Sequence, residues 1–206
     1  MRNTQQIVKK YLYNSMPSYA DHSVRVAEYM LRMQEILVGN GDLRFKAWQP
    51  DVLWLAGAFH DIGKIFVPRE LLEKNVALTE DEWAQMRAHT TLSAGFLHKK
   101  VRDVSESSQY DEALEACIHT AMFHHERMDG SGYPSGASGE DIPLIARLCA
   151  VSDVYDALTA DRPYRKAVSV ECAAQKLLEQ AGITLDASIV EPVFGNEANL
   201  ARLSVA

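Results

Sequence analysis

Residues 52–64 read Val-Leu-Trp-Leu-Ala-Gly-Ala-Phe-His-Asp-Ile-Gly-Lys, and this stretch decides the fold. Its apolar part, Val52 to Phe59, is far too short to cross a bilayer. It follows Pro50 and Asp51, so it predicts a helix buried in a protein core that ends near Gly63. The histidine and aspartate at its end, His60 and Asp61, are therefore expected at the edge of that core.

Helical periodicity extends to both sides of this segment. Apolar residues recur every three or four positions after Asp21, until Gly39-Asn40-Gly41 ends the pattern. Thr79 and Glu82 form a capping box at the start of another helix, and Ser169 can cap one that Gly182 closes. The expected helices cover residues 21–37, 79–97, 111–125, 145–158 and 169–178. Alternating strand patterns are missing, so the sequence predicts a single all-α domain.

Residues 127–143 interrupt the helical pattern with four glycines and two prolines, Gly130, Gly132, Gly136, Gly139, Pro134 and Pro143. A loop of this length is long for a compact domain and is typical of a functional segment.

The composition restricts the class of protein. The chain has 206 residues, of which 47% are apolar, and its formal net charge is −7. This charge argues against DNA or RNA as a partner, since nucleic-acid binding needs a basic surface. Signal-peptide and membrane-spanning stretches are not seen, so we expect a cytoplasmic protein. The widely spaced Cys117, Cys149 and Cys172 are expected to be reduced thiols.

Histidines and aspartates at the ends or on the faces of different helices are candidate metal ligands. Besides His60 and Asp61 these are His22, His89, His124, His125 and Asp153. Side chains from separate helices of a bundle can converge in its core, and one aspartate can bridge two metals with its two oxygens. Such a pair activates a bridging hydroxide for attack at phosphorus. Mostly imidazole ligands favour iron, manganese, nickel or zinc over magnesium. His98 and His119 have no such context and are expected to be ordinary surface or core residues.

Four motifs in order identify the chain as similar to the HD-GYP family of the HD phosphohydrolase superfamily. Residues 60–64 read His-Asp-Ile-Gly-Lys, and residues 124–134 read His-His-Glu-Arg-Met-Asp-Gly-Ser-Gly-Tyr-Pro. Residues 153–159 read Asp-Val-Tyr-Asp-Ala-Leu-Thr, and residues 162–165 read Arg-Pro-Tyr-Arg. The first motif alone indicates only the wider superfamily, whereas the second is highly specific.

The resemblance implies a helical bundle of the HD superfamily with a Gly/Pro-rich loop, formed by residues 1–206 as one domain. Residues 1–17 would lead into the domain, residues 22–166 would carry the motifs, and residues 167–206 would form a C-terminal helical segment. Family members often follow a sensory domain.

The resemblance also assigns roles residue by residue. One metal would be held by His22, His60, Asp61 and Asp153. The second would be held by His89, His124 and His125, with Asp61 bridging both. Lys64 matches the lysine beside the phosphate, and the substrate contacts match Tyr133, Arg162 and Arg165. Residues expected to shape the loop or to orient the ligands are Glu126, Asp129, Gly130 and Gly132, the two glycines through positive φ angles.

A glutamate that holds a third metal in some family members is replaced here by Ser18. Asp21 lies close to this position but is adjacent to His22, so it should point in another direction. We therefore expect two metals. Iron or manganese is favoured over nickel or zinc.

The activity implied is hydrolysis of cyclic di-GMP to the linear dinucleotide pGpG, to GMP, or to both. The alternatives are a hydrolase of mixed cyclic GMP-AMP, a general nucleotidase of the superfamily, and a weakly catalytic sensor. Such a module would bind the dinucleotide, or dock a diguanylate cyclase through the 127–143 loop.

Overall fold

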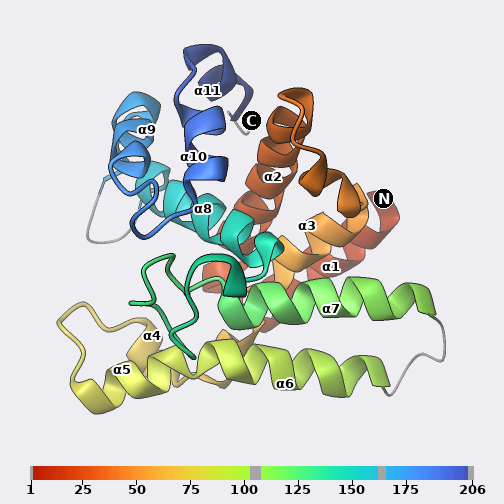
Figure 1. Cartoon of the computed structure of the whole chain (residues 1–206). Helices are drawn as coiled ribbons and strands as arrows, with labels where there is room; N and C mark the ends of the chain where they lie inside the picture. Colours follow the sequence, from red (N-terminus) through yellow and green to blue (C-terminus); the bar gives the residue numbers. More distant parts are fainter. Residues whose placement is uncertain (1, 103–107, 162–165, 204–206) are drawn as a thin grey trace.

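A computed structural model of the chain describes residues 2–102, 108–161 and 166–203 (Figure 1). Within these ranges the regular structure is helical, with one isolated bridge between Ala181 and Leu185 and no strand. The α-helices are α1 (Arg2–Ser15), α2 (Pro17–Gly39), α3 (Pro50–Phe59), α4 (Arg69–Leu72), α5 (Glu80–Arg87), α6 (His89–Arg102), α7 (Ser108–Phe123), α8 (Leu144–Thr159), α9 (Val170–Leu178), α10 (Ala187–Phe194) and α11 (Glu197–Leu203). Three 3₁₀ turns are η1 (Leu43–Ala47), η2 (Ile62–Phe66) and η3 (Gly139–Asp141). The all-α prediction is confirmed.

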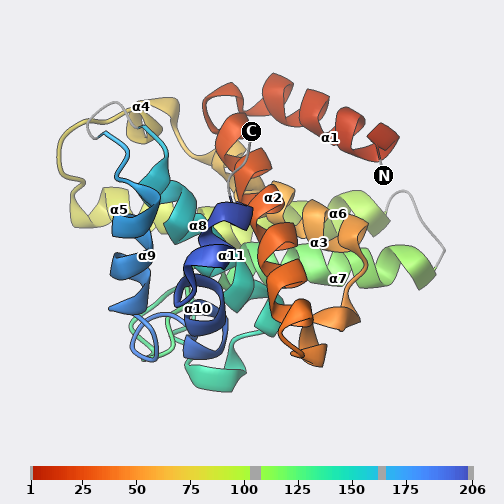
Figure 2. The same cartoon turned by 90° about the horizontal axis from the view of Figure 1, so that it is seen from above.

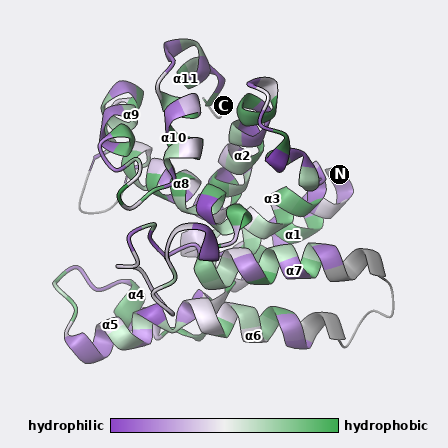
Figure 3. Cartoon of the chain, in the orientation of Figure 1, coloured by the Kyte–Doolittle hydropathy of each residue, from purple (hydrophilic) through white to green (hydrophobic). Residues whose placement is uncertain are grey.

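The predicted core helix is α3, which lies between α2 and the antiparallel pair α6 and α7 (Figures 1 and 2). Its Trp54 is 1% exposed and donates a hydrogen bond from Nε1 to Glu28 of α2 at 3.0 Å. On the other side of α2, Tyr155 of α8 packs edge-on against Tyr29 and also contacts Phe194 of α10. Stretches of α2, α3 and α8 are green, that is apolar, in Figure 3. Burial of large side chains thus joins the C-terminal helices to the centre.

The prediction of one continuous helix over residues 79–97 is wrong. The capping box at Thr79 is present, but α5 ends at Arg87 and α6 begins at His89. Thr90 and Thr91 donate hydrogen bonds to the carbonyls three residues before them, and His89 does the same through Nδ1. Three successive side chains thus compete for the carbonyls of the last turn of α5, which bends or ends a helix.

Four helices, α1, α4, α10 and α11, were not predicted individually, although residues 167–206 were expected to form a helical segment. Residues 2–15 are mostly polar, and α1 forms because Val8 and Leu12, one turn apart, are both buried against the core. Helices α10 and α11 are short, and α10 contains Pro192, which normally indicates a helix end. Their position depends on tertiary packing, which local periodicity does not report.

Other predictions concern the surface and the thiols. In the described ranges, none of the helices combines the length and hydropathy needed to cross a membrane. Cys117 and Cys149 are buried free thiols and Cys172 is an exposed one, as expected. The division of the chain into lead-in, motif region and C-terminal segment stays a prediction.

Candidate metal centre

The two carboxylate oxygens of Asp61 face different groups of histidines. Asp61 lies at the end of α3, is 1% exposed, and has its Oδ2 at 3.4 Å from Nε2 of His60 and 3.6 Å from Nε2 of His22. Its Oδ1 is 3.2 Å from Nε2 of His89 and 3.7 Å from Nε2 of His124. One aspartate therefore stands between two imidazole clusters, the arrangement that a bridging ligand needs.

Hydrogen bonds at Nδ1 orient these imidazoles. In His60 this atom donates to the carbonyl of Gly57, and in His89 to that of Met86, both at 2.7 Å. His124 bonds in the same way to the carbonyls of the preceding turn, at 3.0 and 3.1 Å. A carbonyl only accepts, so the proton lies on Nδ1 and the lone pair of Nε2 points towards Asp61. Metal-binding histidines are prepared in this way by a partner at the other ring nitrogen.

Four buried polar atoms at the centre have no hydrogen-bond partner among the described residues. Nε2 of His60, His89 and His124 and Oδ1 of Asp61 are all shielded from solvent without a hydrogen bond in the described part of the chain. Leaving such atoms unpaired costs free energy, which a cation placed among them would remove. The donor set therefore fits transition-metal ions.

The ligand atoms form two groups whose members lie within 4.8 Å of one another. One group comprises Asp61, His89, His124 and His125, and the other comprises His22, His60 and Asp61. Asp153 of α8 lies beside the second group, with its Oδ1 3.3 Å from Nε2 of His22. All the side chains predicted as ligands are thus brought together from α2, α3, α6, α7 and α8.

Electrostatics keep the cluster ready for cations. Burial alone would raise the pKa of Asp61, but the Lys64 ammonium and the surrounding imidazoles hold it well below its ordinary value. Lys64 lies 2.5 Å from Asp61 Oδ2, and this contact raises the pKa of the lysine against its burial. Burial lowers the pKa of His124 to about 4, and that of His125 well below its usual range. Both imidazoles are therefore neutral donors at physiological pH.

His22 is held by a carboxylate that sequence reasoning gave no role. Its Nδ1 lies 2.7 Å from Asp156, which also accepts from Nε and a terminal nitrogen of Arg25 at 2.6 and 3.1 Å. Burial lowers the pKa of His22, but Asp156, Asp61 and Asp153 outweigh it and raise the value to about 9. Asp156 stands one position after Tyr155 in the quoted motif. It lies three positions after Asp153 on the same helix, and this spacing was the signal that both carboxylates face the same side.

The loop over residues 127–143 lies above the junction of α5 and α6 (Figure 1). Its Tyr133 stacks on His125 with ring centroids 4.7 Å apart at 27°. Burial raises the pKa of Tyr133, helped by the charges of Asp61 and Asp153, so the phenol keeps its proton. The predicted substrate residue thus lies against a candidate ligand.

Two carboxylates hold the loop by accepting hydrogen bonds from its serines. Glu126 is 2% exposed and accepts from both the amide and the hydroxyl of Ser135 at 2.7 Å. Asp129 accepts from the amide and hydroxyl of Ser131 at 2.9 and 2.6 Å. Neither carboxylate belongs to the two candidate metal groups.

The prediction of positive φ angles is right for Gly130, at +78°, and wrong for Gly132. A Cβ on Gly132 would lie 2.4 Å from Cα of Glu126, so this glycine serves close backbone approach instead. Gly63 is similar, because a Cβ there would lie 2.1 Å from the carbonyl oxygen of His89. Its amide donates to Ser93 Oγ at 2.7 Å. These glycines let the motif segments pack against the ligand-bearing backbone.

The remaining predicted residues lie apart from the cluster. Arg162 and Arg165 are outside the described residues. Ser18 is exposed, and Asp21 accepts a hydrogen bond from Tyr13, away from His22. His98 is exposed, and His119 pairs only loosely with Glu115 at 4.0 Å.

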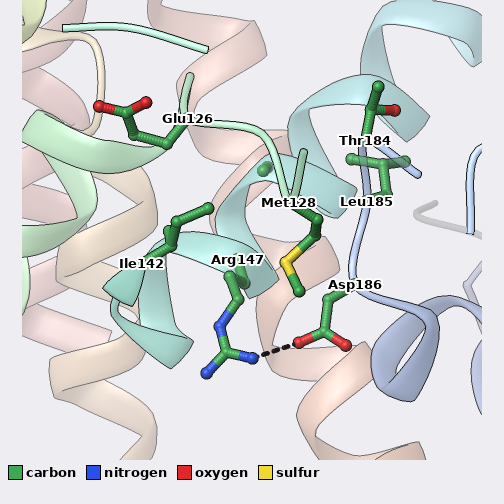
Figure 4. Close-up of a pocket in the computed structure, with 8 residues that line it drawn as sticks. Glu126, Met128, Ile142, Arg147, Thr184, Leu185 and Asp186 are labelled. Carbon is green, nitrogen blue, oxygen red and sulfur yellow. Dashed lines mark hydrogen bonds and ion pairs between the residues drawn. The ribbon is translucent and has the colours of Figure 1, made fainter. Parts of the chain in front are cut away.

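Behind the loop is a small cavity of about 10 Å³, shown in Figure 4. Arg147 of α8 pairs there with Asp186 at 2.6 Å, next to Met128 of the loop. The amide of Met128 also donates to the carbonyl of Thr184 at 3.1 Å. This volume is about that of one water molecule, which is too small for a substrate. The contacts around the cavity instead attach the loop to the α9–α10 connection.

The chain matches the family model described as HD domain over residues 20–189. A probable cyclic di-GMP phosphodiesterase of Vibrio cholerae is 35% identical over 89% of this chain and 41% of the relative. A cyclic di-GMP phosphodiesterase of Pseudomonas aeruginosa is 43% identical over 62% of this chain and 28% of the relative. A 3'3'-cGAMP-specific phosphodiesterase of Vibrio cholerae is 32% identical over 82% of this chain and 33% of the relative. The chain thus spans less than half the length of each.

Among solved structures, an HDG"Y"P protein from Bdellovibrio bacteriovorus covers 93% of this chain with a TM-score of 0.58. The match covers 61% of that chain, and the two are 17% identical. At this identity the likeness concerns the fold alone.

Proposed function

The chain belongs to the HD domain family, and from this premise we propose that it is a metal-dependent phosphodiesterase that opens cyclic di-GMP to pGpG, GMP or both. The observation that carries the proposal is the position of Asp61 between two groups of histidines, three of which have a buried Nε2 without a hydrogen-bond partner among the described residues. The names of the relatives supply the substrate class, since several are cyclic dinucleotide phosphodiesterases.

Two divalent ions would be held by the cluster, one by each histidine group, with Asp61 common to both. His22, His60 and Asp153 would complete one site, and His89, His124 and His125 the other. Five of the seven proposed ligand residues are histidines and two are aspartates, which supports iron or manganese first and nickel or zinc as alternatives. When bound, such a pair supplies Lewis acidity and an activated water for in-line attack at phosphorus.

The protein side chains would position the phosphodiester and stabilise its developing charge. The Lys64 ammonium, close to Asp61 and 15% exposed, can reach a phosphate oxygen at the centre. The protonated phenol of Tyr133 can donate to the substrate while its ring packs on His125. Arg162 and Arg165 are proposed as further substrate contacts, by their match to the family motif.

Mixed cyclic GMP-AMP is a second candidate substrate, favoured by the similarity to a 3'3'-cGAMP-specific enzyme. A third role, as a sensor or as a docking module for a diguanylate cyclase through the 127–143 loop, could accompany catalysis in the cytoplasm. Loss of metal ligands would favour binding without turnover, and the described cluster retains all of the predicted ones.

The test combines metal analysis with turnover. The protein is purified without oxygen, its metals are quantified, and manganese or ferrous iron is added. Cyclic di-GMP and cyclic GMP-AMP are then followed by chromatography for the wild type, Asp61→Ala, and the control Asp42→Ala, which removes a half-buried aspartate that pairs with Arg44 and belongs to neither candidate metal group. We expect linear product from the wild type and the control, and none from Asp61→Ala. Bound metal without turnover of either dinucleotide would refute the phosphodiesterase.

Metal removal gives a second readout that does not depend on substrate. A ligand present at about a hundred times its Kd stabilises the native state by about 2.7 kcal/mol. For a chain of this size this corresponds to a melting temperature lower by about 5–10 °C after chelation. An unchanged melting temperature would contradict a metal site built into the core.

A further inference from the structure

Helix α5 carries an exposed aromatic residue that core packing does not explain. The helix has no buried residue, and its polar character is visible in Figure 3. Among its polar residues is Trp83, whose large aromatic side chain is 45% exposed. Large aromatic side chains usually contribute to cores or to binding surfaces, and this one lies outside the core cluster.

Arg87, one helical turn after Trp83, has its guanidinium between two aromatic rings. Its Cζ lies 5.7 Å from the ring centre of Trp83 and 5.3 Å from that of Tyr133. No carboxylate in the described part of the chain lies within ion-pair distance of it. The guanidinium is therefore oriented by ring contacts while its hydrogen-bond donors are open to an anionic ligand.

These contacts form a continuous series that begins at the metal centre. His125 stacks on Tyr133, Tyr133 contacts Arg87, and Arg87 contacts Trp83. The series leads from the buried cluster to the protein surface along the edge of the 127–143 loop. A ligand held at the metal centre and longer than one nucleotide would extend over it.

We propose that Trp83 and Arg87 form an outer subsite for the nucleotide unit of a cyclic dinucleotide that is not being cleaved. The indole would stack on the purine base, and the guanidinium would bind the phosphate of that unit. Stacking on a tryptophan tolerates any purine, and an arginine fork matches a phosphate. This subsite rests on the proposed function, since it assigns the second half of the same substrate.

The variants Trp83→Ala and Arg87→Ala test the subsite with two substrates. Bis(p-nitrophenyl) phosphate has a phosphodiester but neither purine nor second phosphate. For cyclic di-GMP we expect KM to rise about tenfold in each variant while kcat is retained. For bis(p-nitrophenyl) phosphate kcat/KM should stay unchanged. Trp83→Phe, which keeps a stacking ring, should recover most of the affinity. Leu43→Ala and Arg69→Ala are matched exposed controls.

Tryptophan fluorescence gives a readout without turnover. Trp54 is buried and Trp48 is half-buried against Phe45, so the quenching that a base stacked on Trp83 causes is the part that Trp83→Phe removes. In a Lys64→Met background loaded with manganese, cyclic di-GMP should quench the emission, and Trp83→Phe should abolish the change.

The outcomes separate the two proposals. An unchanged KM for cyclic di-GMP in both variants, with normal wild-type turnover, would overturn the subsite alone. An equal loss on both substrates would show a structural role for α5 and also overturn it. Wild-type turnover of bis(p-nitrophenyl) phosphate without any turnover of a cyclic dinucleotide would overturn the proposed function. In that case, absent quenching would reject the subsite, and quenching lost in Trp83→Phe would support it.

Discussion

The metal centre and the outer series Tyr133–Arg87–Trp83 are adjacent but are built on different principles. At the centre, side chains from five helices converge, most are fully buried, and the histidines are fixed by hydrogen bonds to backbone carbonyls or a carboxylate. In the outer series, a loop residue and two residues of a peripheral helix interact through ring contacts near solvent. The centre is expected to decide whether any phosphodiester is cleaved, and the outer series to decide which one is bound.

This difference leads to unequal effects of substitution. A change at the centre leaves a buried charge or donor unpaired, or removes a cation, and therefore acts on every substrate. A change in the outer series removes one contact that water can replace.

The largest effect is expected for Asp61→Asn. Asparagine has the shape of aspartate but lacks the charge, and its NH₂ group would face one of the two histidine clusters. We expect both metals to be lost and turnover of cyclic di-GMP to fall below detection. Metal content per chain and product formation are measured together. A variant that retained metal and activity would show that Asp61 does not bridge.

Lys64→Met should lower kcat by about a hundredfold to a thousandfold, the usual cost of removing one donor that stabilises developing charge. Methionine preserves the unbranched apolar stem of the lysine. The metal content should stay that of the wild type, because Lys64 is no ligand. Steady-state kinetics with metal analysis check this, and loss of metal in the variant would point instead to a role in holding Asp61.

Asp156→Asn tests the support of His22. The change weakens the paired hydrogen bonds from Arg25 and the orientation of the imidazole, so metal affinity at this site should fall about 10- to 100-fold. The control is Asp186→Asn, another buried aspartate paired with an arginine, which lies by the cavity behind the loop. Manganese titration of both variants should show weaker binding in the first only. Equal manganese affinities of the two variants would show that Asp156 does not support the metal site.

The sequence predicted the centre more completely than its surroundings. Each ligand that the motifs indicated is in the described cluster, because the chemistry requires those residue types and the helical bundle brings their helices together. The family that the motifs predict is confirmed by the HD domain match and the similar phosphodiesterases, whereas the metal-binding role of these residues stays a prediction. The central helices were predicted because their apolar residues recur with the helical period.

What the sequence did not predict depends on tertiary contacts. The break after Arg87 arises from hydrogen bonds of His89, Thr90 and Thr91 to backbone carbonyls, a pattern that helical periodicity does not reveal. Arg87 lies at this break, and its guanidinium carbon is 5.3 Å from the ring centre of Tyr133. Trp83 and Arg87 belong to no motif, so only their position beside the loop indicates a role.

The smallest effect is expected for Tyr133→Phe, where the centre and the outer series meet. The ring and its stack on His125 are kept, while the one hydroxyl that can donate to the substrate is removed. A single hydrogen bond in a partly hydrated site contributes about 0.5–1.5 kcal/mol, so KM should rise about two- to tenfold with metal content unchanged. Tyr133→Ala also removes the ring that separates His125 from Arg87, and should affect both metal affinity and KM. If the phenylalanine variant lost metal, the hydroxyl would belong to the centre, and the boundary between the two regions would lie beyond Tyr133.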